Sequence, residues 1–478
     1  MSAVFYIFAD MNDVFVSLLL MGALSTGGDL PYWAYTNQFD LVPRTAGYSA
    51  VLNAGQRYDE TKTFQWHWGV SAALRGDNYD KATFIPDEIY AGIRWKNLAL
   101  DLGLKHPQQE FLGSSATIGT ISTTGGNLIM SGNARSMPGY RISLRPTNIP
   151  FTNGYLQIKG AFADYRMTDT RIENRTFAHN TAIYLIGNIN RVSIMVGLDH
   201  WAMWDGSGID NYIRMLVGKN AGAGGTLSDR MNVIGNQLGA EKIAVSYRGN
   251  GWRAEIRHDI PYDDKSGMIF KNFPDGVNTL NFSFDEKNRW VSDIVYEFQY
   301  TMFQSGPMHD PEVDEHGNPI KWRPGLNFVG GDNYFNNGEF PSGWTHYGMT
   351  IGNPLFFPAG THNGSWSRKG ATRGVENNRL KAHHIGVSGK LFKKVPYKLL
   401  ATYSMDYGTY RMPYAGESAW GHPWGTVKET PLRQFSFGFT CEVPLLDGHL
   451  QIIPGIFADK GSVLRDSFGF TLALRANL

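Results

Sequence analysis

One segment brings amides, a carboxylate and aromatic rings close together in the chain. It covers residues 330–355, GGDNYFNNGEFPSGWTHYGMTIGNPL. Sugar recognition uses planar polar groups for hydroxyls and aromatic faces for the C–H side of a ring, held on fixed loops. The segment therefore predicts a glycan-binding loop. The alternative is a tight turn network, because Asn, Asp and Gly favour local backbone hydrogen bonds. The candidate residues are Asp332, Asn333, Tyr334, Asn336, Asn337 and Trp344.

Two further groups could contact a sugar. Trp420, His422 and Trp424 lie in a stretch rich in Gly and Pro, which suggests a loop outside lipid. For this triplet, glycan contact and plain loop packing are equal alternatives. Arg373 lies in a basic stretch that could attract acidic sugars. The alternatives for Arg373 are a solvated loop or contact with lipopolysaccharide phosphates.

Catalytic and metal-binding motifs give no comparable signal. The single cysteine, Cys441, rules out a disulfide within the chain and a Cys-based zinc site. The chain has no HExxH pair, nucleophile elbow or phosphate-binding loop in a convincing setting. We therefore expect no enzymatic activity, no metal site and no cofactor. A hydroxyl–imidazole or paired-carboxylate site could still be assembled by the fold, which the sequence alone cannot reveal.

Composition narrows the class of protein. Lys plus Arg number 44 and Asp plus Glu number 43, for a formal net charge of +1, so no basic excess points to nucleic acid. Charged residues make up only 18% of the chain, while Gly numbers 55 and aromatic residues reach 13%. Few charges, many turns and many aromatics are typical of an all-β protein with a lipid-facing surface.

The elements that must position these loops show a period of two. In residues 64–74 aromatic and aliphatic side chains alternate with polar ones, and the same rhythm recurs to the end of the chain. After the first 25 or so residues no apolar run approaches the roughly 20 residues of a spanning helix. We predict a closed antiparallel transmembrane β-barrel of about 16–18 strands with long extracellular loops. The stretch 113–140 alternates poorly, and it either enters the lumen or extends an edge.

The first residues carry a second pattern. Residues 14–24, VFVSLLLMGAL, form an apolar stretch of signal-peptide length, and small residues at 23 and 25 suit cleavage after Ser25. The basic residues expected before such a stretch are missing, since the first Lys or Arg is Arg44. We predict an atypical signal peptide over residues 1–25 and one barrel domain over 26–478. The alternative is a buried N-terminal strand or helix.

Several stretches occur in an order that resembles a known family. They are PYWAYTNQFDLVP (31–43), GNLIMSGNARSMPGYRISL (126–144), IPFTNGYLQIKGAFADY (149–165) and the segment 330–355. Together they resemble the capsule-assembly Wzi-like family, in the branch common in Bacteroidetes bacteria. The resemblance implies an integral outer-membrane barrel of a Gram-negative bacterium. It also implies a lectin-like role in holding capsular or exopolysaccharide at the cell surface.

Three functions follow as hypotheses. The first is a barrel that binds surface polysaccharide, with outer-membrane lipid and lipopolysaccharide as its other partners. The second is a diffusion channel, because charged residues on the lumen face suit a wet pore. The third, for which no motif argues, is a barrel enzyme that acts on lipid or glycan.

Overall fold

The computed structural model describes residues 14–56, 59, 61–169, 176–219, 233–263, 270–306, 315–316, 331–366, 374–422 and 424–477. Arg373 lies outside these residues. The helices are α1 (Tyr32–Tyr35) and α2 (Ile209–Leu216), with short 3₁₀ turns at Ala116–Ile118 and Leu446–Gly448. The strands are β1 (Val14–Ser25), β2 (Gly47–Gln56), β3 (Phe64–Gly76), β4 (Thr83–Trp95), β5 (Leu98–Leu104), β6 (Pro138–Asn148), β7 (Leu156–Arg166), β8 (Phe177–Ile189), β9 (Val192–Trp204), β10 (Asn236–Arg248), β11 (Trp252–Asp263), β12 (Gly276–Phe284), β13 (Asp293–Tyr300), β14 (Thr345–His346), β15 (Met349–Thr350), β16 (Arg379–Leu391), β17 (Val395–Gly408), β18 (Leu432–Cys441), β19 (Val443–Leu445), β20 (Leu450–Gly461) and β21 (Ser467–Asn477).

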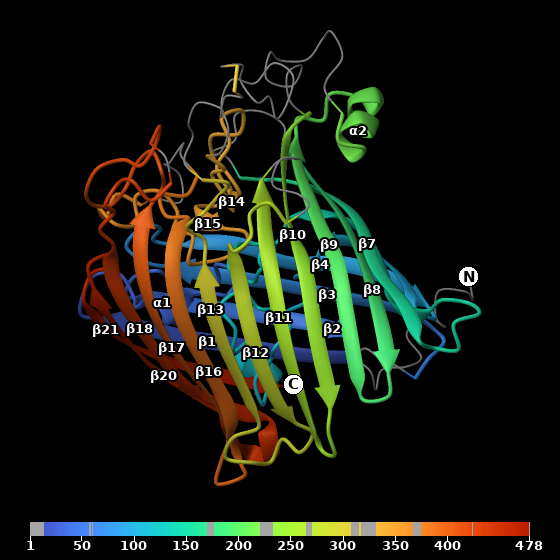
Figure 1. Ribbon diagram of the computed structural model, residues 1–478. Helices are drawn as coiled ribbons and strands as arrows, with labels where there is room; N and C mark the ends of the chain where they lie inside the picture. The colour runs from blue at the N-terminus through green and yellow to red at the C-terminus, as the bar shows by residue number, and fades with distance from the viewer. Residues whose placement is uncertain are drawn as a thin grey trace.

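The long strands close into one barrel (Figure 1). Neighbours along the chain pair antiparallel, and β1 closes the ring by pairing with both β2 and β21. β18 and β19 are separated only by Glu442 and both pair with β20, so the 19 segments of this sheet make an 18-stranded barrel. The predicted fold class is confirmed, at the upper end of the expected strand number.

The barrel wall is apolar outside and polar inside. In β3, Trp66 and Val70 are exposed, whereas the alternating residues His67 and Ser71 are buried. The same parity recurs around the ring, and most of the exposed large hydrophobic side chains of the described chain lie on strands. A water-soluble sandwich would bury those side chains, so this outer face is built for lipid.

Helices do not contribute a membrane crossing. In the part of the chain that the structure describes, no helix combines the length and the apolar character that a span requires.

The two ends of the barrel differ in their connections. At one end the strands join through short turns, such as 96–97, 190–191 and 392–394, and β1 begins and β21 ends there. At the other end lie the long connections 105–137, 301–378 and 409–431. Outer-membrane barrels place short turns in the periplasm and long loops outside. We therefore call the second end the extracellular end; it is uppermost in Figure 1.

The segment predicted as a signal peptide contributes a strand of the wall. β1 pairs from Val14↔Gln56 to Ala23↔Gly47 with β2, and from Ser17↔Asn477 to Ser25↔Gly469 with β21. Cleavage after Ser25 would remove this strand and leave two unpaired edges in lipid, which is costly. In the structure of the full chain, residues 14–25 thus form an N-terminal strand. Cleavage itself stays a prediction.

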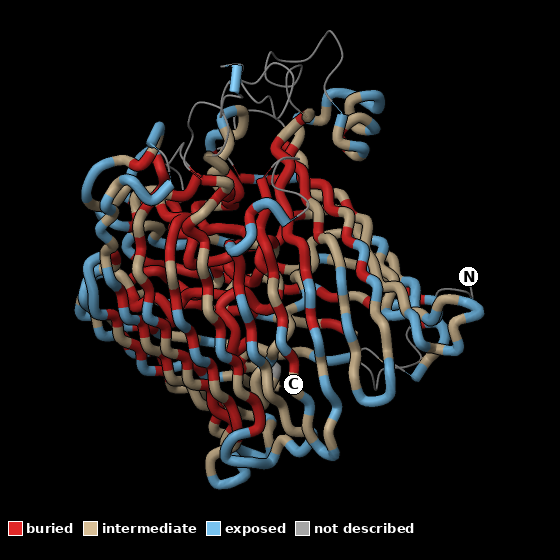
Figure 2. The backbone as a smooth tube through the Cα atoms, viewed as in Figure 1, coloured by how far each residue is buried: buried red, intermediate tan, exposed pale blue. Residues whose placement is uncertain are grey.

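Connections from the extracellular end fold into the lumen. We call residues 26–46, 105–137 and 331–366 the plug. They share one buried apolar cluster, and backbone hydrogen bonds join the second and third segments (Ser131 N to Ile351 O, 2.9 Å). Buried residues gather in the extracellular half of the barrel (Figure 2). The stretch 113–140, for which lumen and edge were both open, enters the lumen.

Glycines in the wall mark where the plug touches it. A Cβ at Gly386 of β16 would lie 1.9 Å from the carbonyl oxygen of Ile121, and one at Gly438 of β18 would lie 2.8 Å from the Cβ of Trp33. Only a residue without a side chain allows the plug to approach the strand so closely. These two positions fix the first two plug segments against the inner wall.

Candidate functional site

The segment 330–355 lies in the plug, and its aromatic residues are core residues. The side chain of Trp344 is fully buried, and its indole N–H donates to the carbonyl of Ile129 at 2.6 Å. Its ring centroid lies 5.4 Å from that of Trp201 on β9. Tyr334 is also buried and donates its hydroxyl to Asp275 at 2.9 Å. Neither ring is placed to stack on a sugar.

The polar residues of this segment form hydrogen bonds with one another and with nearby segments of the same polypeptide. Asp332 accepts a hydrogen bond from Asn272 at 2.9 Å. Asn333 accepts from Asn336 at 3.1 Å, and Asn336 pairs with the backbone of Val375 through both its side-chain atoms. The turn network named as the alternative for this segment accounts for these contacts.

Asn337 follows the same pattern. Its side-chain oxygen accepts from the backbone N–H groups of Glu339 and Phe340, at 2.8 and 3.2 Å, and its amide donates to Asn236 of β10. The segment therefore acts through its fold, by holding the plug together under the extracellular loops.

The Trp420, His422 and Trp424 triplet lies at the extracellular end, in the connection 409–431. His422 and Trp424 are exposed, and Trp420 is half-buried. The guanidinium of Arg411 lies 4.1 Å from the Trp420 ring centroid, and Trp424 packs edge-on against Phe303 at 5.4 Å. Ring faces beside a cation, on a loop directed outwards, are suited to a sugar ring with acidic substituents.

The base of this loop is anchored in the barrel. Arg379, at the start of β16, is buried and forms an ion pair with Glu429 in which one N–H···O distance is 2.9 Å. Its guanidinium also stacks over the ring of Tyr410 at 3.6 Å. Tyr410 in turn donates its hydroxyl to the carbonyl of Phe303 at 2.7 Å. A bidentate Arg–carboxylate pair with a stacked ring gives the aromatic loop a fixed base.

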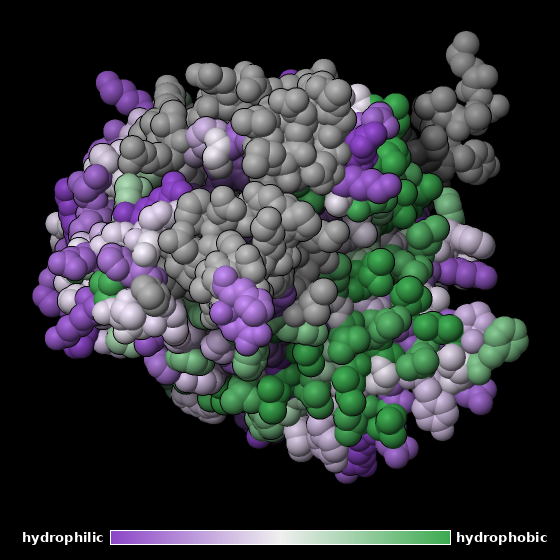
Figure 3. Space-filling view, turned by 45° about the horizontal axis from the view of Figure 1, so that its top comes forward, coloured by the Kyte–Doolittle hydropathy of each residue, from purple (hydrophilic) through white to green (hydrophobic). Residues whose placement is uncertain are grey.

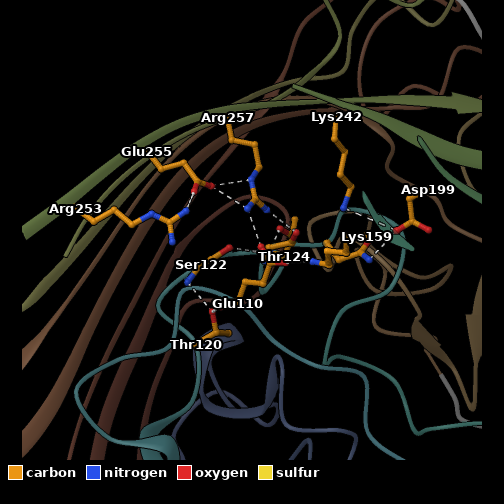
Figure 4. A network of polar contacts seen from close by, with 12 residues as sticks. Glu110, Thr120, Ser122, Thr124, Lys159, Asp199, Lys242, Arg253, Glu255 and Arg257 are labelled. Atoms are coloured by element: carbon orange, nitrogen blue, oxygen red, sulfur yellow. Dashed lines mark hydrogen bonds and ion pairs between the residues drawn. The ribbon is translucent and has the colours of Figure 1, made fainter. Parts of the chain in front are cut away.

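Inside the barrel, charged side chains of the wall bind the plug (Figure 4). Arg257 of β11 donates to Glu110 of the plug at 2.7 Å and to the carbonyl of Gly126 at 3.0 Å. It also contacts Glu255 at 2.8 Å, and Glu255 accepts from Arg253 at 2.5 Å. The plug is thus tied to β11 at two points by one guanidinium.

A second contact ties the plug to β9. Asn127 of the plug donates to Asp199 at 2.8 Å, and Asp199 lies 3.8 Å from the ammonium nitrogen of Lys242 on β10. Asn180 of β8 donates to the other oxygen of Asp199 at 2.8 Å. Among the charged residues of the lumen face, Arg257 and Asp199 therefore bind the plug.

The charged groups around Glu110 change the pKa of its carboxyl group. Burial alone would raise its pKa, but the charges of Arg257, Lys159 and Lys242 outweigh burial and lower the pKa to about 2. Glu110 is therefore ionised at every ordinary pH, and its charge supports the clamp.

A hydroxyl, an imidazole and a carboxylate meet on the outer wall. Thr181 Oγ1 lies 2.7 Å from His179 Nε2, and His179 Nδ1 lies 2.9 Å from Asp164 Oδ1. This is the order of contacts in a hydrolytic triad. However, the imidazole has no exposed surface, and the ring of Tyr212 from α2 lies against it at 5.9 Å. The hydroxyls of Tyr140 and Tyr212 donate to the second oxygen of Asp164. We assign the cluster to holding α2 on the wall.

Sequence comparison identifies no relative, since neither a protein-family model nor a curated protein matches the chain. Solved structures do match in fold. Wzi of Escherichia coli, described as an outer-membrane protein involved in group 1 capsule assembly and as a carbohydrate-binding β-barrel, is 11% identical with a TM-score of 0.50. That match covers 96% of this chain and 83% of Wzi.

Porin-like barrels of Pseudomonas aeruginosa match more loosely. OccK3 (OpdO) is 10% identical with a TM-score of 0.46, covering 98% of this chain and 96% of its own. The outer-membrane protein opdK is 10% identical with a TM-score of 0.45, covering 98% and 99%. At these identities the likeness concerns the fold alone. The likeness to Wzi supports a Wzi-like barrel fold, while placement in the Bacteroidetes branch stays a prediction.

The closed ring and its apolar outer face define where the protein resides. The chain is an integral outer-membrane β-barrel.

Proposed function

We propose that this barrel binds polysaccharide at the cell surface and holds it there, through the extracellular loop that carries Trp420, His422 and Trp424. The observation that carries the proposal is the pairing of an exposed aromatic loop with a rigid base: Trp424 is 45% exposed, while Arg379 beneath it is fully buried. Preorganised aromatic faces bind a ligand at little entropic cost. A fold shared with Wzi, whose description names carbohydrate binding, agrees with this role.

The plug inside the barrel argues in the same direction. The plug is held to the inner wall by Arg257 and Asp199, and it is held by close backbone approach at Gly386. A protein that acts through its outer loops needs a firm platform beneath them, whereas a free diffusion channel needs an open path.

The test is made in the producing strain. The chromosomal copy is replaced by a Trp420→Ala/Trp424→Ala variant, and surface-attached and shed polysaccharide are measured. We expect attachment to fall and shedding to rise, with the amount of barrel in the outer membrane unchanged. A matched control is Trp290→Ala, since Trp290 is an exposed tryptophan in the turn before β13, at the opposite end. A cell coat that stays unchanged in the double variant contradicts the proposal.

The second candidate function, a diffusion channel, is favoured by exposed charge inside the barrel. The side chains of Arg253 and Lys159 are 49% and 40% exposed although both lie on the lumen side. Planar-bilayer recording of the purified barrel decides this candidate. Conductance steps that shift their ion selectivity in Arg253→Glu would support a channel, and electrical silence would remove it.

A further inference from the structure

The helix α2 lies against the outside of the barrel wall. In β9 the exposed side chains of Ile194 and Val196 face outwards, so Ala202, of the same parity, faces outwards as well. Ala202 is nevertheless fully buried, because it packs with Met215 of α2 and with Ile234. Figure 1 shows α2 beside the upper ends of these strands.

The contacts of α2 set its depth. The Tyr212 hydroxyl donates to Asp164 at 2.8 Å, and Asp164 is the register partner of His179 on β8. We call the exposed apolar side chains on the outer face of the strands the lipid-facing belt. Ile183 belongs to this belt and lies on the same strand and face as His179. Strands rise about 3.3 Å per residue, so His179 lies only about 13 Å along the strand from Ile183. The helix therefore sits beside the wall, at the border of the belt.

One stripe of α2 remains uncovered. Ile209, Ile213 and Val217 are 75%, 50% and 58% exposed, and their spacing of four residues places them on one side of the helix. The charged pair Asp210 and Arg214, joined at 2.8 Å, lies on the flank away from the wall. The apolar arc of the helix is thus half covered by protein and half bare.

We propose that α2 is an interfacial helix whose stripe of Ile209, Ile213 and Val217 contacts the lipid of the outer leaflet. The strand against which α2 packs, β9, carries the exposed apolar side chains of Ile194 and Val196. Apolar side chains gather along one side of the molecule from the lower wall to its upper edge (Figure 3). Helices with one apolar and one charged flank lie at the headgroup boundary in this way. The proposed partner of the stripe is lipid. The test below distinguishes lipid contact from contact with protein or water. The inference does not depend on the proposed glycan binding.

Single-cysteine labelling tests the depth of the stripe. Cys441, the only native cysteine, is changed to Ala, and a fluorescent label is attached to Ile213→Cys or, as the control on the charged flank, to Asp210→Cys. The folded barrels are placed in phosphatidylcholine vesicles with a quencher on the upper acyl chain, or with iodide in the water. We expect acyl-chain quenching at 213 to exceed that at 210 by about threefold, and iodide quenching to follow the reverse order.

Two outcomes overturn the proposal. Equal iodide quenching at both positions places the stripe in water, and quenching at 213 by neither agent places it against protein. Folding of each variant is checked by its mobility in unheated gels. Ile209→Cys, on the same stripe, replaces Ile213→Cys if that variant does not fold.

Discussion

Replacing Arg257 with Met should loosen the plug without opening the barrel wall. Met keeps the length of the side chain but removes its contacts to Glu110, Gly126 and Glu255. Removing one partner of a buried ion pair costs about 3–5 kcal/mol. Glu110 is 39% exposed and can regain water, so we take the lower end, about 3 kcal/mol. That cost corresponds to about a hundredfold more frequent local opening.

Hydrogen exchange of the folded barrel measures this opening directly. The backbone N–H groups of Glu110 and Asn127 are bonded within the plug, to the carbonyls of Gly125 and Thr124. We expect their exchange to accelerate by about two orders of magnitude, while strand amides keep their protection.

Arg253→Met is the matched control. Arg253 is half-exposed, and its described ion pair is with Glu255 rather than with the plug. Unchanged exchange of the plug amides in Arg257→Met, or equal acceleration in both variants, would refute the view that this guanidinium clamps the plug.

Three further predictions concern the plug core, the clamp and the first strand. Trp344→Ala should lower barrel stability by about 3–5 kcal/mol, seen as a lower midpoint of heat-induced gel mobility change; an unchanged midpoint would contradict the buried position of this indole. Because the folded pKa of Glu110 is lowered to about 2, its stabilising effect is complete above the usual value of 4.5 and is lost as pH falls towards 2. Plug exchange, corrected for its intrinsic pH dependence, should rise over that interval in the native chain but not in Glu110→Gln. Intact mass of protein from outer membranes tests the predicted cleavage: an N-terminus at Thr26 would confirm it, and retention of Val14–Ser25 would show that this strand stays in the wall.

The alternation of apolar and polar residues was the main basis for predicting the fold. A period of two with aromatic residues on one face specifies a strand and its two environments, and in β3 the predicted outer residues Trp66 and Val70 are indeed exposed. The N-terminal strand was harder to read. Residues 14–24 are apolar on both parities, so composition alone makes them resemble a signal peptide, and only the pairing with β2 and β21 distinguishes a strand.

Burial could not be predicted for two of the candidate site residues. Trp344 and Tyr334 have the chemistry of a sugar site, but no local pattern reveals that a long connection folds back into the lumen. A usable signal was present in the wall: Gly386 and Gly438 interrupt strands that are otherwise well patterned, which indicates close backbone approach. The Trp420 loop was predicted to lie outside lipid from its Gly and Pro content, and its described residues contain no strand of the barrel.

Binding of the strain's own surface polysaccharide to the refolded barrel in lipid vesicles tests the central claim most directly. We predict saturable binding that Trp420→Ala and Trp424→Ala each weaken by about fivefold or more, the loss of a stacked ring being worth roughly 1–3 kcal/mol, while Trp290→Ala binds as the native chain does. Absence of binding by the folded native barrel, or equal binding by all variants, would contradict a glycan-holding role for this loop.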